Sequence, residues 1–81
     1  MAYYITNYGY EIDLGELKGA TLLFYMECFG LRHYITTFLY EEIDLFCVSI
    51  MEPRHLDSLN MNAQDKNYMN DFIQFYKELI N

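Results

Sequence analysis

The chain has 81 residues, of which 53% are hydrophobic and 19% aromatic, and its twelve Asp and Glu against five Lys and Arg give a net charge of −7. This length predicts a single domain over residues 1–81. The negative charge argues against a protein that binds nucleic-acid phosphates or an anionic membrane directly. Nine tyrosines and six phenylalanines can fill a core, and we expect several tyrosines to keep their hydroxyl groups at the surface.

The first residues favour β structure. Tyr3–Thr6 and Tyr8–Ile12 are rich in aromatic and β-branched residues. They are separated near Asn7 and interrupted by Gly9, so they can form one strand or a ragged hairpin.

The next segment, Leu14–Phe29, predicts a helix that is buried on nearly all sides. Asp13 followed by Glu16 fits a capping box at its start, and Gly30 fits a glycine stop at its end. An extended run over Ala20–Cys28 is the alternative.

The middle of the chain gives conflicting signals. Leu31–Tyr40 has helical spacing of its apolar residues but a β-branched and aromatic content that suits a strand. Asp44–Met51 alternates apolar and smaller residues and reads as a strand. Because an isolated strand is not viable, we expect the two segments to pair, joined near Glu41 and Glu42.

The C-terminal segment, Ala63–Ile80, predicts an amphipathic helix with a 3.6-residue period, capped by Asn62 and carrying Asp65 in its first turn and Lys77 near its end. The single proline, Pro53, marks the break before it. The predicted fold is therefore α+β: a small antiparallel sheet of three or four strands with two helices on one face, the last helix C-terminal. An all-α bundle is the alternative if Leu31–Tyr40 is helical.

No residue pattern predicts catalysis. His33 and His55 have no partner at metal-ligand spacing, and a zinc site would have to recruit Cys28 and Cys47 from separate segments. No nucleophile elbow or phosphate-binding loop is present. We therefore expect neither an enzyme nor a bound cofactor or metal.

The two cysteines lie in apolar stretches, and we expect them to be free, buried thiols rather than a disulfide. No signal peptide is visible at the start of the chain, and the longest apolar run, Leu22–Met26, is far too short for a membrane helix. These features predict a cytoplasmic protein.

Acidic clusters next to tyrosines are the candidate partner-binding sites. Glu41, Glu42 and Asp44 place three carboxylates beside Tyr40, where they could imitate a row of phosphates. A looser acidic set lies beside two further candidates, Tyr8 and Tyr10; it consists of Glu11, Asp13 and Glu16. The alternative for the first cluster is an ordinary charged turn, and for Asp13 and Glu16 it is helix capping.

The size, acidity and lack of a catalytic pattern resemble the general profile of small protein inhibitors of nucleic-acid enzymes, such as anti-restriction and anti-CRISPR proteins of phages and toxin-immunity proteins. This is a resemblance of composition that no motif carries. It implies a non-catalytic binding protein whose partner has a basic surface. The alternative is a small structural or regulatory module that self-associates, for example as a homodimer, through exposed apolar surface.

Overall fold

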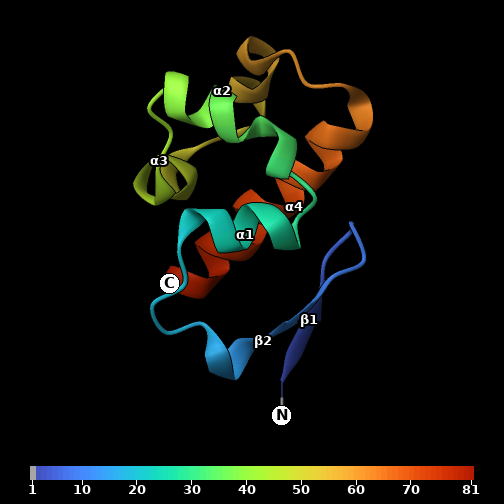
Figure 1. Ribbon diagram of the computed structural model, residues 1–81, viewed down its shortest axis with the longest axis vertical. Coiled ribbons are helices and arrows are strands. Elements are labelled where there is room, and N and C mark those ends of the chain that lie inside the picture. Colours follow the sequence, from blue (N-terminus) through green and yellow to red (C-terminus); the bar gives the residue numbers. More distant parts are fainter. Residues whose placement is uncertain (1) are drawn as a thin grey trace.

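The structure is a computed structural model that describes residues 2–81, and its fold is α+β with a long C-terminal helix (Figure 1). The sheet consists of β1 (Tyr3–Ile5) and β2 (Glu11–Asp13). The α-helices are α1 (Leu22–Cys28), α2 (Ile35–Tyr40), α3 (Leu45–Ile50) and α4 (Ala63–Ile80). Residues 2–81 also contain three 3₁₀ helices: η1 (Leu14–Glu16), η2 (Arg32–Tyr34) and η3 (Pro53–Leu59).

Of the two alternatives for the first residues, one strand or a hairpin, the structure has the hairpin. β1 and β2 are antiparallel, with Tyr4 opposite Ile12. The connecting loop is closed by the backbone N–H of Thr6, which donates to the carbonyl of Tyr10 at 2.9 Å. Gly9 adopts a φ of +104° in this loop, a conformation that a residue with a Cβ rarely takes.

The predicted sheet of three or four strands is wrong, because residues 2–81 contain only these two strands. The segment expected to be a strand over Asp44–Met51 is α3. The Asp44 carboxylate caps this helix by accepting a hydrogen bond from the Cys47 backbone N–H at 2.9 Å. Phe46, Val48 and Ile50, which alternate in the sequence, lie on two sides of this helix. Val48 is in the core, whereas Phe46 and Ile50, four residues apart, are on the exposed side.

The second segment considered for a strand, Leu31–Tyr40, is also helical and forms η2 and α2. Its helical spacing therefore prevailed over its β-branched content. Leu31 and Phe38 are fully buried, and burial of such side chains outweighs propensity differences of a few tenths of a kcal/mol. The residues predicted to join two strands, Glu41 and Glu42, instead join two helices.

The helix predicted over Leu14–Phe29 is shorter than expected. Gly19, with a φ of +80°, interrupts it, so that η1 and α1 are separate elements. Asp13 caps η1 by accepting from the Gly15 N–H at 2.9 Å. The predicted stop at Gly30 is confirmed by its φ of +74°.

The predicted C-terminal helix is confirmed over Ala63–Ile80, including its cap. The Asn62 side chain accepts a hydrogen bond from the backbone N–H of Asp65 at 2.8 Å. The buried face of α4 meets α1 in a stack of rings, in which Phe72 lies 5.0 Å from Phe29 and 5.6 Å from Tyr25 between ring centroids.

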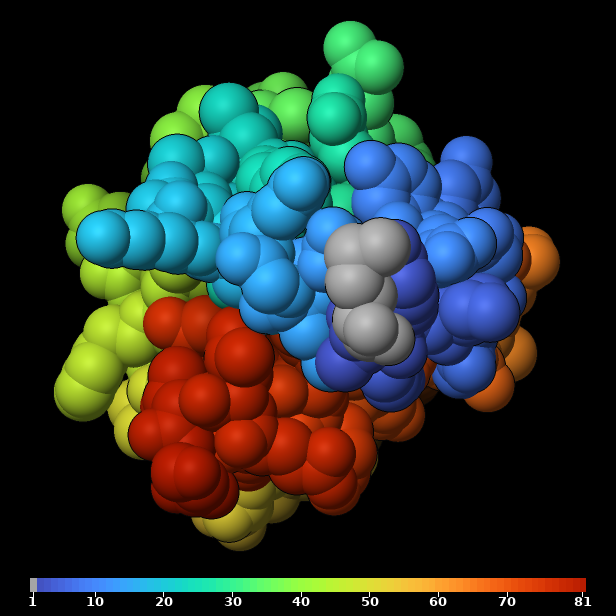
Figure 2. Space-filling view, turned by 90° about the horizontal axis from the view of Figure 1, so that it is seen from below, coloured from blue at the N-terminus to red at the C-terminus, as the bar shows by residue number. Residues whose placement is uncertain are grey.

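The hairpin is attached to α4 by both ring contacts and hydrogen bonds. Tyr4 packs on Phe75 at 4.7 Å between ring centroids, and its hydroxyl donates to the Asp71 carboxylate. The backbone N–H of Asn7 donates to the same carboxylate at 2.7 Å. Figure 2 shows the hairpin and the last turns of α4 side by side on one face of the molecule.

We predict that Phe72→Ala lowers the free energy of unfolding by about 3–5 kcal/mol, because it removes a fully buried ring and leaves a cavity. Phe46→Ala is the matched control. Because the Phe46 ring is 70% exposed, its loss should change the free energy of unfolding by no more than about 0.5 kcal/mol. Urea denaturation of the three proteins measures both effects, and equal losses in the two variants would contradict the assigned core.

Candidate functional site

The acidic turn, Tyr40–Asp44, connects α2 to α3 and is fixed by backbone hydrogen bonds. The N–H of Ile43 donates to the carbonyl of Phe38 at 2.8 Å, and the N–H of Glu42 donates to the carbonyl of Leu39 at 3.3 Å. This pair of bonds is a Schellman motif, which requires a left-handed residue just after the helix. Glu42 takes that position, with a φ of +56°.

The three carboxylates of the acidic turn are exposed. No Lys, Arg or His side chain among residues 2–81 forms an ion pair with Glu41, Glu42 or Asp44. Asp44 also has a structural role, because its carboxylate caps α3. The hydrogen bond from the Cys47 backbone N–H lowers the pKa of Asp44, so this carboxylate stays ionised under mildly acidic conditions. The side chains of Glu41 and Glu42 form no such hydrogen bond within residues 2–81.

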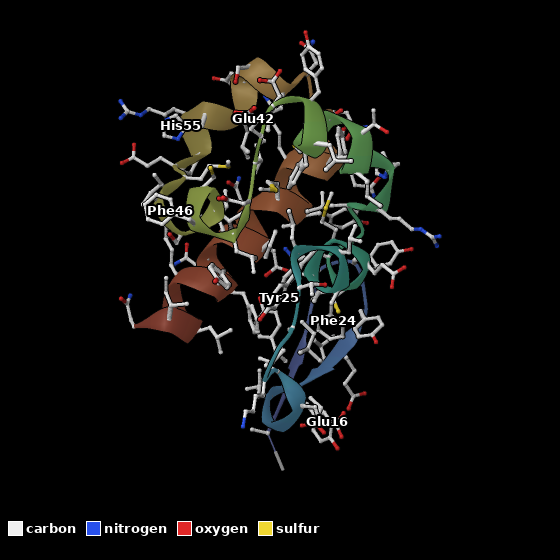
Figure 3. The ribbon with its side chains drawn as sticks, turned by 60° about the vertical axis from the view of Figure 1, so that its left-hand side comes forward. Glu16, Phe24, Tyr25, Glu42, Phe46 and His55 are labelled. Carbon is white, nitrogen blue, oxygen red and sulfur yellow. The ribbon has the colours of Figure 1, made fainter. Side chains whose placement is uncertain are left out.

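Large apolar side chains surround the acidic turn on the surface. Tyr40 is 84% exposed and Leu39 75% exposed, while Phe46, on the first turn of α3, points away from the body of the molecule (Figure 3). Tyr40 was among the predicted site residues, whereas Leu39 and Phe46 were not, because both lie in segments that were expected to pair as strands. Their exposure makes this surface a mixture of negative charge and apolar area.

A shallow hollow of about 520 Å³ lies between α2 and η3 and borders the acidic turn. Tyr40 and Glu41 line one side of it, and Ser58 and Asn60 line the other. A cationic side chain that entered this hollow would meet a carboxylate and an aromatic ring together, and both attract cations.

The other two predicted site residues, Tyr8 and Tyr10, lie elsewhere. They belong to the hairpin loop, which Figure 1 shows on the opposite side of the molecule from the connection between α2 and α3. The Tyr8 ring contacts Tyr68 edge to face at 5.6 Å and covers Gly30, where an added Cβ would lie 2.4 Å from a ring carbon. Tyr8 therefore packs against the body of the protein, and the six predicted residues do not form one site.

Tyr8 also borders a second hollow, of about 430 Å³, between the hairpin loop, η2 and α4. On its wall the Asp65 carboxylate accepts a hydrogen bond from the Tyr34 hydroxyl at 2.6 Å and lies 3.2 Å from Nε2 of His33. The Tyr34 bond is the main cause that lowers the pKa of Asp65. Burial, together with that bond, raises the pKa of Tyr34 to about 12.

Asp65, His33 and Tyr34 form a cluster, the Asp65 cluster, that links α4 to η2. Sequence reasoning missed it because 31 and 32 residues separate its members along the chain, and no spacing pattern signals such a contact. The Asp65 carboxylate is mostly buried and engaged by two partners. The arrangement therefore supports a structural role.

The remaining candidates for chemistry do not gather. Within residues 2–81, no three His, Cys, Asp or Glu side chains come together as a metal site. Cys28 and Cys47 are free. Cys28 is buried as predicted, and this burial raises the pKa of its thiol to about 11. Cys47 is only half-buried, and its thiol lies 3.7 Å from the carbonyl of Glu42.

We predict that Glu42→Gly raises the free energy of unfolding by about 0.5–1 kcal/mol. Glycine at φ +56° removes left-handed strain of about 1–2 kcal/mol, which exceeds the entropy cost of glycine of about 0.5–1 kcal/mol. Glu41→Gly removes a neighbouring carboxylate at an ordinary φ of −85° and should lower the free energy of unfolding by about 0.5–1 kcal/mol. Thermal and urea denaturation measure both. Effects of the same sign in the two variants would contradict the assigned turn.

We predict that Asp65→Asn lowers the free energy of unfolding by about 1–3 kcal/mol at neutral pH, because it weakens two hydrogen bonds to a carboxylate. Since folding lowers the pKa of Asp65, its stabilisation is present above the unfolded pKa of about 3.9 and is lost as the pH falls through the folded value. The difference between wild type and Asp65→Asn should therefore shrink below about pH 4.

Urea denaturation over a range of pH tests this prediction. Asp57→Asn is the control, because the ion pair of Asp57 with Lys66 at 3.0 Å is exposed and should contribute less than about 1 kcal/mol. A deficit in Asp65→Asn that stayed constant on acidification would contradict the assigned role of the carboxylate.

No protein-family model matches the chain, and neither a curated protein nor a solved structure matches it. None of the helices in residues 2–81 combines the length and the apolar character needed to cross a bilayer.

Proposed function

We propose that this protein is a small acidic binding protein without catalytic activity, which inhibits a nuclease or another nucleic-acid-acting enzyme by occluding its basic surface. The observation that carries the proposal is the acidic turn, where Glu41, Glu42 and Asp44 are exposed without an ion-pair partner among residues 2–81, next to the exposed ring of Tyr40.

The electrostatics of this surface suit a basic partner. A protein with a net charge of −7 attracts a cationic surface over a distance of about 8–10 Å at physiological salt. This attraction mainly raises the association rate and disfavours acidic partners. Carboxylates on the turn would compete with nucleic-acid phosphates for the same Lys and Arg side chains of the enzyme.

The apolar neighbours of the carboxylates supply the contacts that slow dissociation. Aromatic side chains are enriched among the residues that dominate binding energy, and they act best where surrounding contacts exclude water. Tyr40 and Phe46 flank the carboxylates from α2 and α3. Because the Schellman motif and the Asp44 cap fix the backbone, little conformational entropy is lost when a partner binds.

The proposal implies that inhibitor and enzyme meet in the cytoplasm. Reducing conditions there keep thiols such as Cys28 and Cys47 free.

The test is inhibition of DNA or RNA cleavage by purified nucleases: restriction enzymes, CRISPR-associated nucleases and nuclease toxins. We expect the protein to inhibit at least one of them, to block its binding to nucleic acid, and to lose affinity as salt rises. Glu41→Lys combined with Glu42→Lys should weaken inhibition at least tenfold, because two attractions become repulsions. The melting temperature should not fall, since neither side chain has a hydrogen-bond or ion-pair partner among residues 2–81.

The matched control is Glu11→Lys combined with Glu16→Lys, which changes the net charge by the same amount. Glu16 lies at the opposite end of the molecule from Glu42 (Figure 3), so this variant should still inhibit. Equal loss of inhibition in both double variants would mean that net charge alone causes the effect. That result would refute the assigned surface. Absence of inhibition of every nuclease would refute the function itself.

Self-association through exposed apolar side chains is a second candidate function. Phe46 and Ile50 lie on one exposed side of α3, and both are more than half exposed. Sedimentation analysis distinguishes the candidates. A dimer that resists dilution and that the substitution Ile50→Ser disrupts would favour a structural module. A monomer whose binding depends steeply on salt would favour the inhibitor.

A further inference from the structure

The surface between α1 and α2 carries an apolar groove that the acidic turn closes at one end. Its floor is formed by Met26 and Phe38, both fully buried, and its rims are formed by Leu23 and Leu39, which are 54% and 75% exposed. Ile35 and Ile43 are half-buried beside them. Two leucines on different helices therefore expose apolar surface toward one concave space, which is where ligands and partner side chains bind.

The size of the groove sets what can enter it. Its volume is about 150 Å³, similar to that of an engineered apolar cavity in another protein that holds one benzene molecule. One large apolar side chain, a leucine, methionine or phenylalanine, would fill it. A whole helix or a drug-sized molecule would not.

The charges around the groove determine the neighbours of that side chain. Within one helical turn of Leu23 and Leu39 along the chain, the charged residues are Glu27, Glu41 and Glu42. Glu27 is paired with Arg32 at 3.8 Å, whereas Glu41 and Glu42 have no ion-pair partner among residues 2–81. Opposite charge therefore favours a segment that places Lys or Arg beside its apolar residue.

The same charges disfavour a second copy of this chain in the groove. A twofold contact between two copies would bring two molecules of charge −7 together and would place the acidic turns of both near one interface. Like charges brought together in this way cost binding energy.

We propose that the groove between α1 and α2 is the anchor site for a basic protein segment, which inserts one large apolar side chain between Leu23 and Leu39 while its flanking Lys or Arg residues contact Glu41 and Glu42. This inference rests on the proposed function and identifies the segment of the partner that the inhibitor binds. It makes the contact specific, because charge alone would not distinguish one basic surface from another.

The probe is a short capped peptide with a single leucine flanked on each side by lysines, titrated into ¹⁵N-labelled protein and followed by NMR. We expect shifts centred on Leu23, Met26, Leu39 and Ile43 as well as on the acidic turn. The same peptide with serine in place of leucine should bind about tenfold or more weakly, since burial of one leucine side chain accounts for a difference of this size. A peptide with glutamates in place of the lysines should not bind.

Two variants of the protein test the groove itself. Leu23→Ser and Leu39→Ser alter exposed rim residues, so both should fold, and each should weaken the leucine peptide about tenfold. Ile5→Ser is the control, because Ile5 is 67% exposed on the distant strand β1. This variant should bind the leucine peptide as tightly as wild type does. Equal binding of the leucine and serine peptides, or of the lysine and glutamate peptides, would overturn the inference. So would a dimer that buries Leu39 in the absence of peptide.

The nuclease assay separates this inference from the proposed function. If Leu39→Ser inhibits the nuclease as well as wild type while Glu41→Lys combined with Glu42→Lys does not, the inhibitor function stands and the anchor site fails. If the leucine peptide binds in the groove and no nuclease is inhibited, the anchor site stands and the nuclease function fails.

Discussion

The ring of Phe72 is the point on which the rest of the structure depends. It stacks between Phe29 and Tyr25, and all three rings are buried. Tyr4 brings the hairpin to the same cluster through Phe29 and Phe75. Aromatic contacts of this kind add about 0.5–1.5 kcal/mol each beyond the area that they bury. In a chain of 81 residues, whose total stability is on the order of 4–12 kcal/mol, this cluster supplies a large share of the free energy that holds the sheet and helices together.

Because the aromatic cluster carries so much of the stability, the distant connection between α2 and α3 is free to carry groups that do not stabilise the fold. Val48 anchors α3 in the core and Phe38 anchors α2. The residues between them close a turn through backbone hydrogen bonds and the Asp44 cap, without the side chains of Glu41 and Glu42. Glu42 occupies a left-handed position there that glycine would occupy with less strain. A carboxylate that costs stability at an exposed turn is consistent with a role in contacting another molecule.

The long helix was predicted from the sequence, and the hairpin was one of two alternatives for the first residues. The short helices were not predicted, for a physical reason. Over the eighteen residues of α4 the 3.6-residue period repeats five times, whereas over the six residues of α3 it cannot be separated from a period of two. The residue that could have indicated a helix is Asp44. It was interpreted as a surface charge, and in the structure it caps α3. The carboxylates of the acidic turn could be grouped from sequence because they are neighbours along the chain. The groove between Leu23 and Leu39 and the contact between His33 and Asp65 could not, since both depend on tertiary packing.

The two thiols differ in burial, so a reagent in solution can reach one cysteine more easily than the other. Cys28 is sealed in the core and is hardly ionised at neutral pH, because its thiol pKa is raised to about 11. Cys47 is partly open to solvent on α3, three residues from Asp44. A thiol-specific fluorophore would therefore label Cys47 in preference to Cys28. The dye would report on events at this surface without any engineered residue.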